Sequence, residues 1–247
     1  MVHEFIVACN DNNLNKIQQM THMVDIPMNE QGFRHACYYG HIDVVKYLVQ
    51  NIDINIHARN EEGFRWACAN GYIDVIKYLV PLGVDIHARK EEGFGWACMN
   101  GHIDVVKYLV SLGVDIHTNK EECFRWACAN GYIDVIKYLV PLGVDIHVRD
   151  EEGFRWACKN GHIDIVKYLV QNIDINIHTR KEEGFILACK YEHIDVVRYL
   201  VELQRGVKYR KNNGTFIFPN REYDYYNPNK YINNLGSYWT DNNKFIL

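Results

Sequence analysis

The chain has 247 residues, 48% of them hydrophobic and 23% charged, with a formal net charge of −4 at pH 7. These values are ordinary for a folded protein, and the small negative charge gives no whole-chain electrostatic basis for binding nucleic acid or a membrane surface. No stretch of 18 apolar residues occurs, and residues 1–10 lack a basic segment followed by an apolar one. We therefore expect no membrane span, no targeting segment and a cytoplasmic protein.

A phenylalanine that recurs at intervals of 31, 30, 30, 30 and 31 residues defines an internal repeat. The recurring residues are Phe33, Phe64, Phe94, Phe124, Phe154 and Phe185. Phe5 opens an earlier, degenerate repeat, so we count about seven repeats. We expect residues 1–32 to be an N-terminal capping repeat, 33–203 to hold six repeats, and 204–247 to be a tail or cap.

One repeat, residues 64–93, shows the elements in chain order. Residues 64–70 predict a short first helix, and Gly71 is typical of a helix C-terminus. Residues 73–80 carry an apolar stripe at helical spacing and predict a second helix. Residues 84–93 then predict an extended link or hairpin into the next repeat.

Neither helix is long enough to be stable alone in water, so each repeat must bury its apolar face on its neighbours. This predicts an all-α fold, a helix-turn-helix solenoid with short extended linkers. A tryptophan in each central repeat is expected to form an aromatic ladder within the core. These residues are Trp66, Trp96, Trp126 and Trp156.

Two prolines stand where the second helix of a repeat should finish. Because proline deletes a backbone donor, Pro81 and Pro141 predict that these helices tighten or end by Val80 and Val140.

Residues that carry chemistry elsewhere recur here once per repeat, which argues against a unique site. The linker histidines (His57, His87, His117, His147, His178) are expected to form hydrogen bonds within the linker, not a metal site. The Glu-Glu pairs, such as Glu91-Glu92, are expected to be solvated charges near a helix N-terminus. Seven of the eight cysteines follow an alanine in register and are expected to be buried, reduced thiols. We expect no catalytic residue, cofactor or metal.

Residues 71–80 (Gly-Tyr-Ile-Asp-Val-Ile-Lys-Tyr-Leu-Val) and 83–87 (Gly-Val-Asp-Ile-His) resemble the ankyrin-repeat pattern, Gly-His-x-x-Val-Val-x-Leu-Leu followed by Gly-Ala-Asp-Val-Asn. The repeat departs from the standard one, which has 33 residues and opens with Thr-Pro-Leu-His. This compact repeat is similar to the ankyrin families of amoeba-infecting giant viruses (mimivirus type). The resemblance implies a non-catalytic protein-binding scaffold, a monomer that binds a protein partner, in the host cytoplasm if the chain is viral.

The resemblance also implies binding through the linker tips and first-helix surface, where two arginine columns fall. The column that follows each phenylalanine contains Arg34, Arg65, Arg125 and Arg155, with Gly95 and Ile186 in the remaining repeats. The column two residues after each linker histidine contains Arg59, Arg89, Arg149 and Arg180, with Asn119 in the remaining repeat. Both columns are candidate protein-interaction residues. The alternative is that they only pair with the neighbouring glutamates.

The composition changes in the tail, residues 204–247, where seven Lys or Arg and three acidic residues give a charge of +4. Residues 209–218 predict a small hairpin that turns at Asn213-Gly214. The tail is expected to cap the last repeat, to act as a protein-binding arm, or to contact nucleic acid through basic residues among tyrosines. A nucleic-acid-associated protein acting through this tail is therefore the alternative function.

Overall fold

The computed structural model describes residues 2–204, 210–212 and 215–217. In this part, fourteen α-helices follow one another as seven pairs, one pair per repeat. The pairs are α1 (Val2–Asn10) and α2 (Leu14–Met20), α3 (Ile26–Tyr39) and α4 (Ile42–Asn51), α5 (Ala58–Ala69) and α6 (Ile73–Leu79), α7 (Ala88–Met99) and α8 (Ile103–Ser111), α9 (Thr118–Asn130) and α10 (Ile133–Leu139), α11 (Val148–Asn160) and α12 (Ile163–Asn172), and α13 (Thr179–Lys190) and α14 (Ile194–Gln204).

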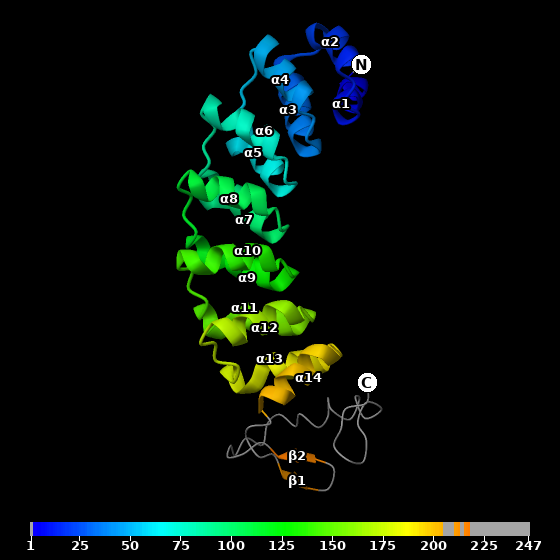
Figure 1. Ribbon diagram of the computed structural model, residues 1–247. Coiled ribbons are helices and arrows are strands. Elements are labelled where there is room, and N and C mark those ends of the chain that lie inside the picture. The colour runs from blue at the N-terminus through cyan, green and yellow to red at the C-terminus, as the bar shows by residue number, and fades with distance from the viewer. Residues whose placement is uncertain (1, 205–209, 213–214, 218–247) are drawn as a thin grey trace. The chain divides into compact units, whose positions relative to one another are not determined.

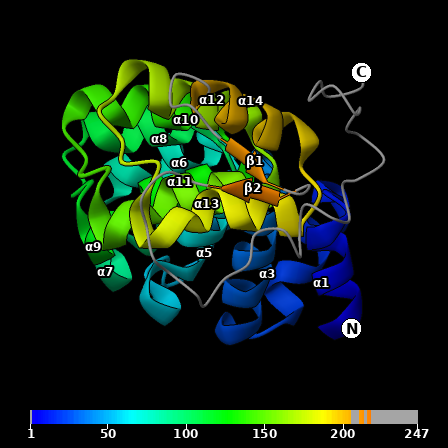
Figure 2. The same cartoon turned by 90° about the horizontal axis from the view of Figure 1, so that it is seen from below.

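The chain divides into two compact units, residues 1–127 with 134–145 and residues 128–133 with 146–247. In the first unit, α1 packs on α3, α3 on α5 and α5 on α7, while α2, α4, α6 and α8 form a second row (Figure 1). In the second unit, α11 packs on α13 and α12 on α14 (Figure 2). Each unit is thus a stack of helix pairs, which confirms the predicted all-α solenoid.

The core of each stack is built from the residues that define the repeat. The seven phenylalanines are 0–3% exposed, and the alanine and cysteine that follow them by three and four positions are 0–4% exposed. Burying a phenylalanine contributes about 2 kcal/mol or more, so the recurring aromatic supplies much of the stability of each interface. The small Ala-Cys pair lets neighbouring first helices approach closely.

All eight cysteines are free and buried, as expected for structural thiols. Burial raises the pKa of Cys9 and Cys189 to about 12, and raises that of Cys37 and Cys128 still more strongly. These thiols therefore stay protonated and unreactive at neutral pH.

The two prolines end their helices as predicted. Helix α6 stops at Leu79 and α10 at Leu139, and each continues as a single 3₁₀ turn, η2 (Val80–Leu82) and η3 (Val140–Leu142). Helix α8, whose equivalent residue is Ser111, stays α-helical to that position.

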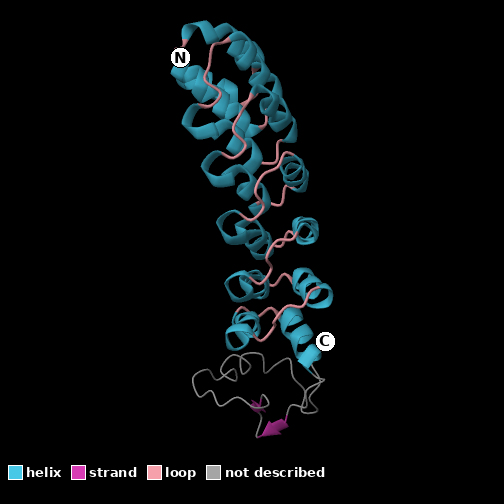
Figure 3. Ribbon diagram, turned by 90° about the vertical axis from the view of Figure 1, so that its left-hand side faces the viewer, coloured by secondary structure: helices cyan, strands magenta, loops and turns pink. Residues whose placement is uncertain are grey.

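The linkers differ from the predicted extended link. No strand forms in the loops of residues 2–204 (Figure 3). Instead, three successive non-glycine residues adopt left-handed backbone angles; in one junction Arg89, Lys90 and Glu91 have φ of 53°, 60° and 62°. The same left-handed turn occurs at 59–61, 119–121, 149–151 and 180–182. A 30-residue repeat leaves too little chain for a hairpin, so this compact turn takes its place.

Left-handed backbone costs roughly 1–2 kcal/mol for each non-glycine residue. Three in succession need compensation from interactions outside the turn. Local sequence does not supply it, because no glycine stands at any of the turn positions.

After the last helix, β1 (Arg210–Asn212) pairs antiparallel with β2 (Thr215–Ile217), with Asn212 opposite Thr215. This confirms the predicted hairpin. Apart from Gln204 and this hairpin, the tail lies outside the described residues, as do its expected roles as a cap, protein arm or nucleic-acid contact. Within the described part, none of the helices combines the length and the apolar character that a membrane span requires.

Candidate protein-interaction site

A buried arginine bonds to the backbone of three of the five left-handed turns, those at 59–61, 119–121 and 149–151. Arg65 Nε donates to the carbonyl oxygen of Asn60 at 2.8 Å, and its Nη2 donates to that of Arg59 at 3.2 Å. The third contact reaches the next repeat, where Nη1 pairs with the carboxylate of Glu92. The same guanidinium lies over the ring of Trp96, 5.4 Å from its centroid. One side chain therefore stabilises the turn of its own repeat and links it to the following one.

Two other repeats show the same arrangement. Arg155 donates to the carbonyl oxygens of Asp150 and Arg149 at 2.9 and 3.0 Å and pairs with Glu183 at 2.8 Å. Arg125 donates to the equivalent turn carbonyls at 2.9 and 3.2 Å. Arg34 precedes the first left-handed turn and pairs with Glu62 at 2.9 Å.

The first candidate column therefore lies inside the protein. Arg34, Arg65, Arg125 and Arg155 are only 3–6% exposed. We call them the inner arginines. Their pairing with neighbouring glutamates agrees with the structural alternative drawn from the sequence. Removing one partner of such a buried pair typically costs about 3–5 kcal/mol, because the other charge stays buried.

The second candidate column lies at the surface. The side chains of Arg59, Arg89, Arg149 and Arg180 are 48–70% exposed, and we call them the outer arginines. The first three lie 3.5–3.8 Å from the glutamate three residues later. Exposed ion pairs of this kind contribute about 0–1 kcal/mol, so these guanidinium groups can exchange partners at little cost.

The linker histidines bond within the linker, as predicted. Each Nδ1 lies 2.6–2.9 Å from a carboxylate oxygen of the glutamate four residues later. These glutamates are not the solvated charges expected from the sequence. Glu61, Glu91, Glu121 and Glu151 are only 5–7% exposed, because the left-handed turn directs them beneath the linker. Glu91 and Glu151 also accept from the backbone N–H of Asp115 and Asn176 in the next linker.

The tryptophans do not stack on one another within the first compact unit. Its described aromatic contacts place His35 and Tyr38 edge-on to Trp66, and an arginine over Trp96. All four tryptophans are half-buried. The expected aromatic ladder is therefore interrupted between Trp66 and Trp96, where Arg65 lies over the ring of Trp96.

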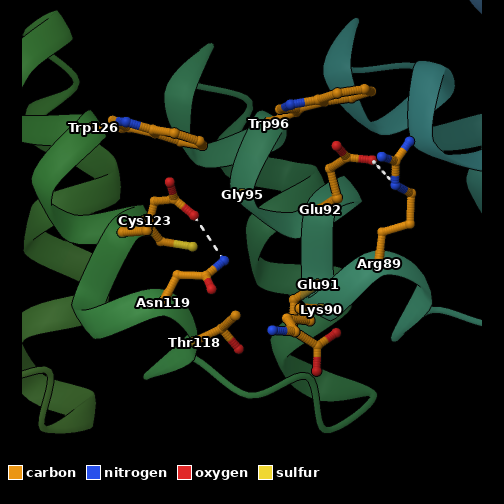
Figure 4. Close-up of a pocket in the computed structure, with 11 residues that line it drawn as sticks. Arg89, Lys90, Glu91, Glu92, Gly95, Trp96, Thr118, Asn119, Cys123 and Trp126 are labelled. Atoms are coloured by element: carbon orange, nitrogen blue, oxygen red, sulfur yellow. Dashed lines mark hydrogen bonds and ion pairs between the residues drawn. The ribbon is translucent and has the colours of Figure 1, made fainter.

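A cavity of about 200 Å³ interrupts the inner arginine column at Gly95, and we call it the Gly95 cavity. It lies within the first compact unit, between the rings of Trp96 and Trp126 on one side and the turn residues Lys90 and Asn119 on the other (Figure 4). The sequence shows the interruption of the column at Gly95, but nothing local in the sequence shows that neighbouring side chains leave the space open.

In the part of the chain that the structure describes, no group of three or more His, Cys, Asp or Glu side chains is placed to hold a metal ion. The recurring histidines are too far apart to converge, since each bonds to the glutamate of its own repeat.

Comparison with known families agrees with this geometry. A family model for ankyrin repeats (three copies) matches residues 5–90, 64–150 and 153–216. No curated protein matches the chain.

The two arginine columns predict effects of different size on stability. Replacing Arg65 with alanine should lower the free energy of unfolding by about 3 kcal/mol, because two turn carbonyls and Glu92 lose their donor. Replacing the exposed Arg59 with alanine should change it by less than about 0.5 kcal/mol. Urea unfolding of the two variants measures both values, and equal effects would refute the assignment of inner and outer columns.

The linker histidines predict a dependence of stability on pH. Hydrogen bonding to Glu91 and Glu121 raises the pKa of His87 and His117, respectively, above the ordinary 6.5. Because the pKa is raised in the folded state, the contribution of these His–Glu bonds to the free energy of unfolding is fully present below about pH 6.5. The contribution of these bonds is lost as the pH rises through the raised pKa of each histidine.

We therefore expect the free energy of unfolding, measured by urea unfolding, to fall as the pH rises above about 6.5. The variant His87→Gln with His117→Gln should show a smaller fall. If the free energy of unfolding falls with pH as steeply in this variant as in the unmodified protein, the His–Glu pairs are not the cause of the fall.

Proposed function

The chain belongs to the ankyrin-repeat family, and from this premise we propose that it is a non-catalytic scaffold that binds a partner protein. Ankyrin repeats generally mediate protein–protein interaction. The near-identity of the central repeats supports this proposal over an enzyme, since a unique reaction centre would require residues that occur once. The recurring surface instead offers the same contact several times.

The observation that carries the proposal is the contrast between the two arginine columns. The inner arginines are buried and bond to turn carbonyls or glutamates, whereas the outer arginines present exposed guanidinium groups at four of the five linkers. Arginine is enriched at binding hot spots because its planar group makes bidentate bonds to carboxylates and stacks on aromatic rings. We propose that the outer arginines contact acidic side chains of the partner.

We further propose that residues 1–32 cap the first repeat and that the tail caps the last. Helix α3 supports the first assignment, because it begins without a left-handed turn, with Asp25 accepting from the backbone N–H of Met28 at 3.0 Å. For the tail, the support is its change of composition and the hairpin of β1 and β2.

The compact repeat and its Ile-Asp-Val-Val-Lys-Tyr-Leu-Val helix support a giant-virus origin. On this basis we propose that the protein is a monomer that binds a host factor in the host cytoplasm.

Charge reversal of the outer arginines should separate binding from folding. The variant Arg59→Glu, Arg89→Glu, Arg149→Glu should lose at least about 90% of the proteins captured from a cell lysate, since three of the four outer arginines then repel acidic side chains of the partner. Its thermal midpoint should stay within about 3 °C of the unmodified protein, because exposed pairs contribute little.

The matched control reverses three exposed lysines of the second helices, Lys46, Lys77 and Lys107. It carries the same charge change on another surface and should leave capture unchanged. Equal loss in both variants would mean that capture depends on net charge alone, which would contradict the proposed site.

A further inference from the structure

The Gly95 cavity stands where four other repeats have an inner arginine. Arg65 shows how such a side chain sits: it donates to the carbonyls five and six residues before it, pairs with the glutamate 27 residues after it and covers the tryptophan 31 residues after it. Counted from Gly95, the same four groups are Lys90, Arg89, Glu122 and Trp126. All four line the Gly95 cavity.

The groups that an arginine would engage here lack that partner. Glu122 has no cationic partner among the described residues, and its carboxylate accepts only from Asn119 Nδ2, at 2.9 Å. Its counterpart Glu92, by contrast, pairs with both an inner and an outer arginine. In the same part of the chain, no side chain donates to the carbonyls of Arg89 and Lys90, and no cation lies over Trp126.

Two further substitutions set this junction apart. Asn119 replaces an outer arginine, so Glu122 lacks the cation that lies three residues before the equivalent glutamate in other repeats. Cys123 replaces the glycine found at this position in the other repeats, and it lies buried against the cavity. The cavity opens at a rim of exposed residues, Arg89, Lys90 and Asn119, through which a side chain from outside can enter.

We propose that the Gly95 cavity binds the side chain of an arginine supplied by a partner protein. The cavity holds the volume of several water molecules, at about 30 Å³ each, which is room for a guanidinium group and part of its stem. The bound group donates to the carbonyl oxygens of Lys90 and Arg89, pairs with Glu122 and stacks on Trp126. The proposal rests on the proposed function as a protein-binding scaffold and names one residue of the partner.

The arrangement selects guanidinium over ammonium. Two adjacent carbonyls and a carboxylate are the acceptors that the fork of Arg65 donors engages in the equivalent position, and the aromatic face favours a planar cation. Lysine offers a compact charge with a strong hydration shell, and it satisfies fewer of these acceptors at once. An anionic side chain would meet Glu122 and is excluded by charge.

The test uses the full chain and two peptides, Ac-Ala-Arg-Ala-NH₂ and Ac-Ala-Lys-Ala-NH₂. We expect the arginine peptide to shift the NMR signal of the Trp126 indole N–H, with at least fivefold tighter binding than the lysine peptide. Gly95→Arg should abolish the shift because its own side chain fills the cavity. Gly95→Ala should keep it, since an added Cβ lies at an ordinary 3.5 Å from Trp126 Cζ3.

A further variant, Glu122→Gln, keeps the test decisive if Gly95→Arg does not fold, and it should weaken binding of the arginine peptide about tenfold. No shift at Trp126, equal binding of the two peptides, or binding that survives in Gly95→Arg or is unaffected by Glu122→Gln would overturn the proposal. These failures are distinct from failure of the scaffold function, because capture through the outer arginines is measured separately.

Discussion

The contact that joins one repeat to the next, at Arg65 and Arg155, is a guanidinium buried between two turn carbonyls and a glutamate of the following repeat. The 30-residue repeat forces a compact turn, and the turn forces three residues into left-handed backbone. Arg65 offsets that cost by satisfying the turn carbonyls from its own helix. Because the same guanidinium also pairs with Glu92, it links the turn of its own repeat to the following repeat.

This dependence shapes where specificity can arise. Repeats that share the same inner arginine, buried glutamate and tryptophan present nearly the same surface, so they can bind only in a repetitive manner. The junction around Gly95 breaks the pattern at three neighbouring positions, with Asn119 and Cys123 as the other two. A repeat array acquires a distinct site most simply by removing a structural side chain and leaving its partners in place.

The sequence predicts much of this fold, because the repeat makes its apolar pattern visible seven times. The buried phenylalanines, the protonated cysteines and the helix ends at Pro81 and Pro141 all follow from spacing and local chemistry. The left-handed turn does not, since its residues have no intrinsic preference for it. Tertiary bonds of an arginine support three of the five turns, and the turns at 89–91 and 180–182 form with Gly95 and Ile186 at that position. For the same reason the burial of Glu61 and its equivalents could not be predicted, and the two arginine columns could not be separated.

A double-mutant cycle between Arg65 and Glu92 tests the central interaction most directly. Equilibrium unfolding of Arg65→Ala, Glu92→Ala and the double variant gives their coupling free energy, and the cycle of the exposed Arg89 with the same glutamate is the control. If Arg65 and Glu92 form a buried ion pair between repeats, their coupling free energy should be at least about 1 kcal/mol. The coupling of the exposed Arg89 with Glu92 should be less than about 0.5 kcal/mol. Additive effects of Arg65→Ala and Glu92→Ala would contradict the account.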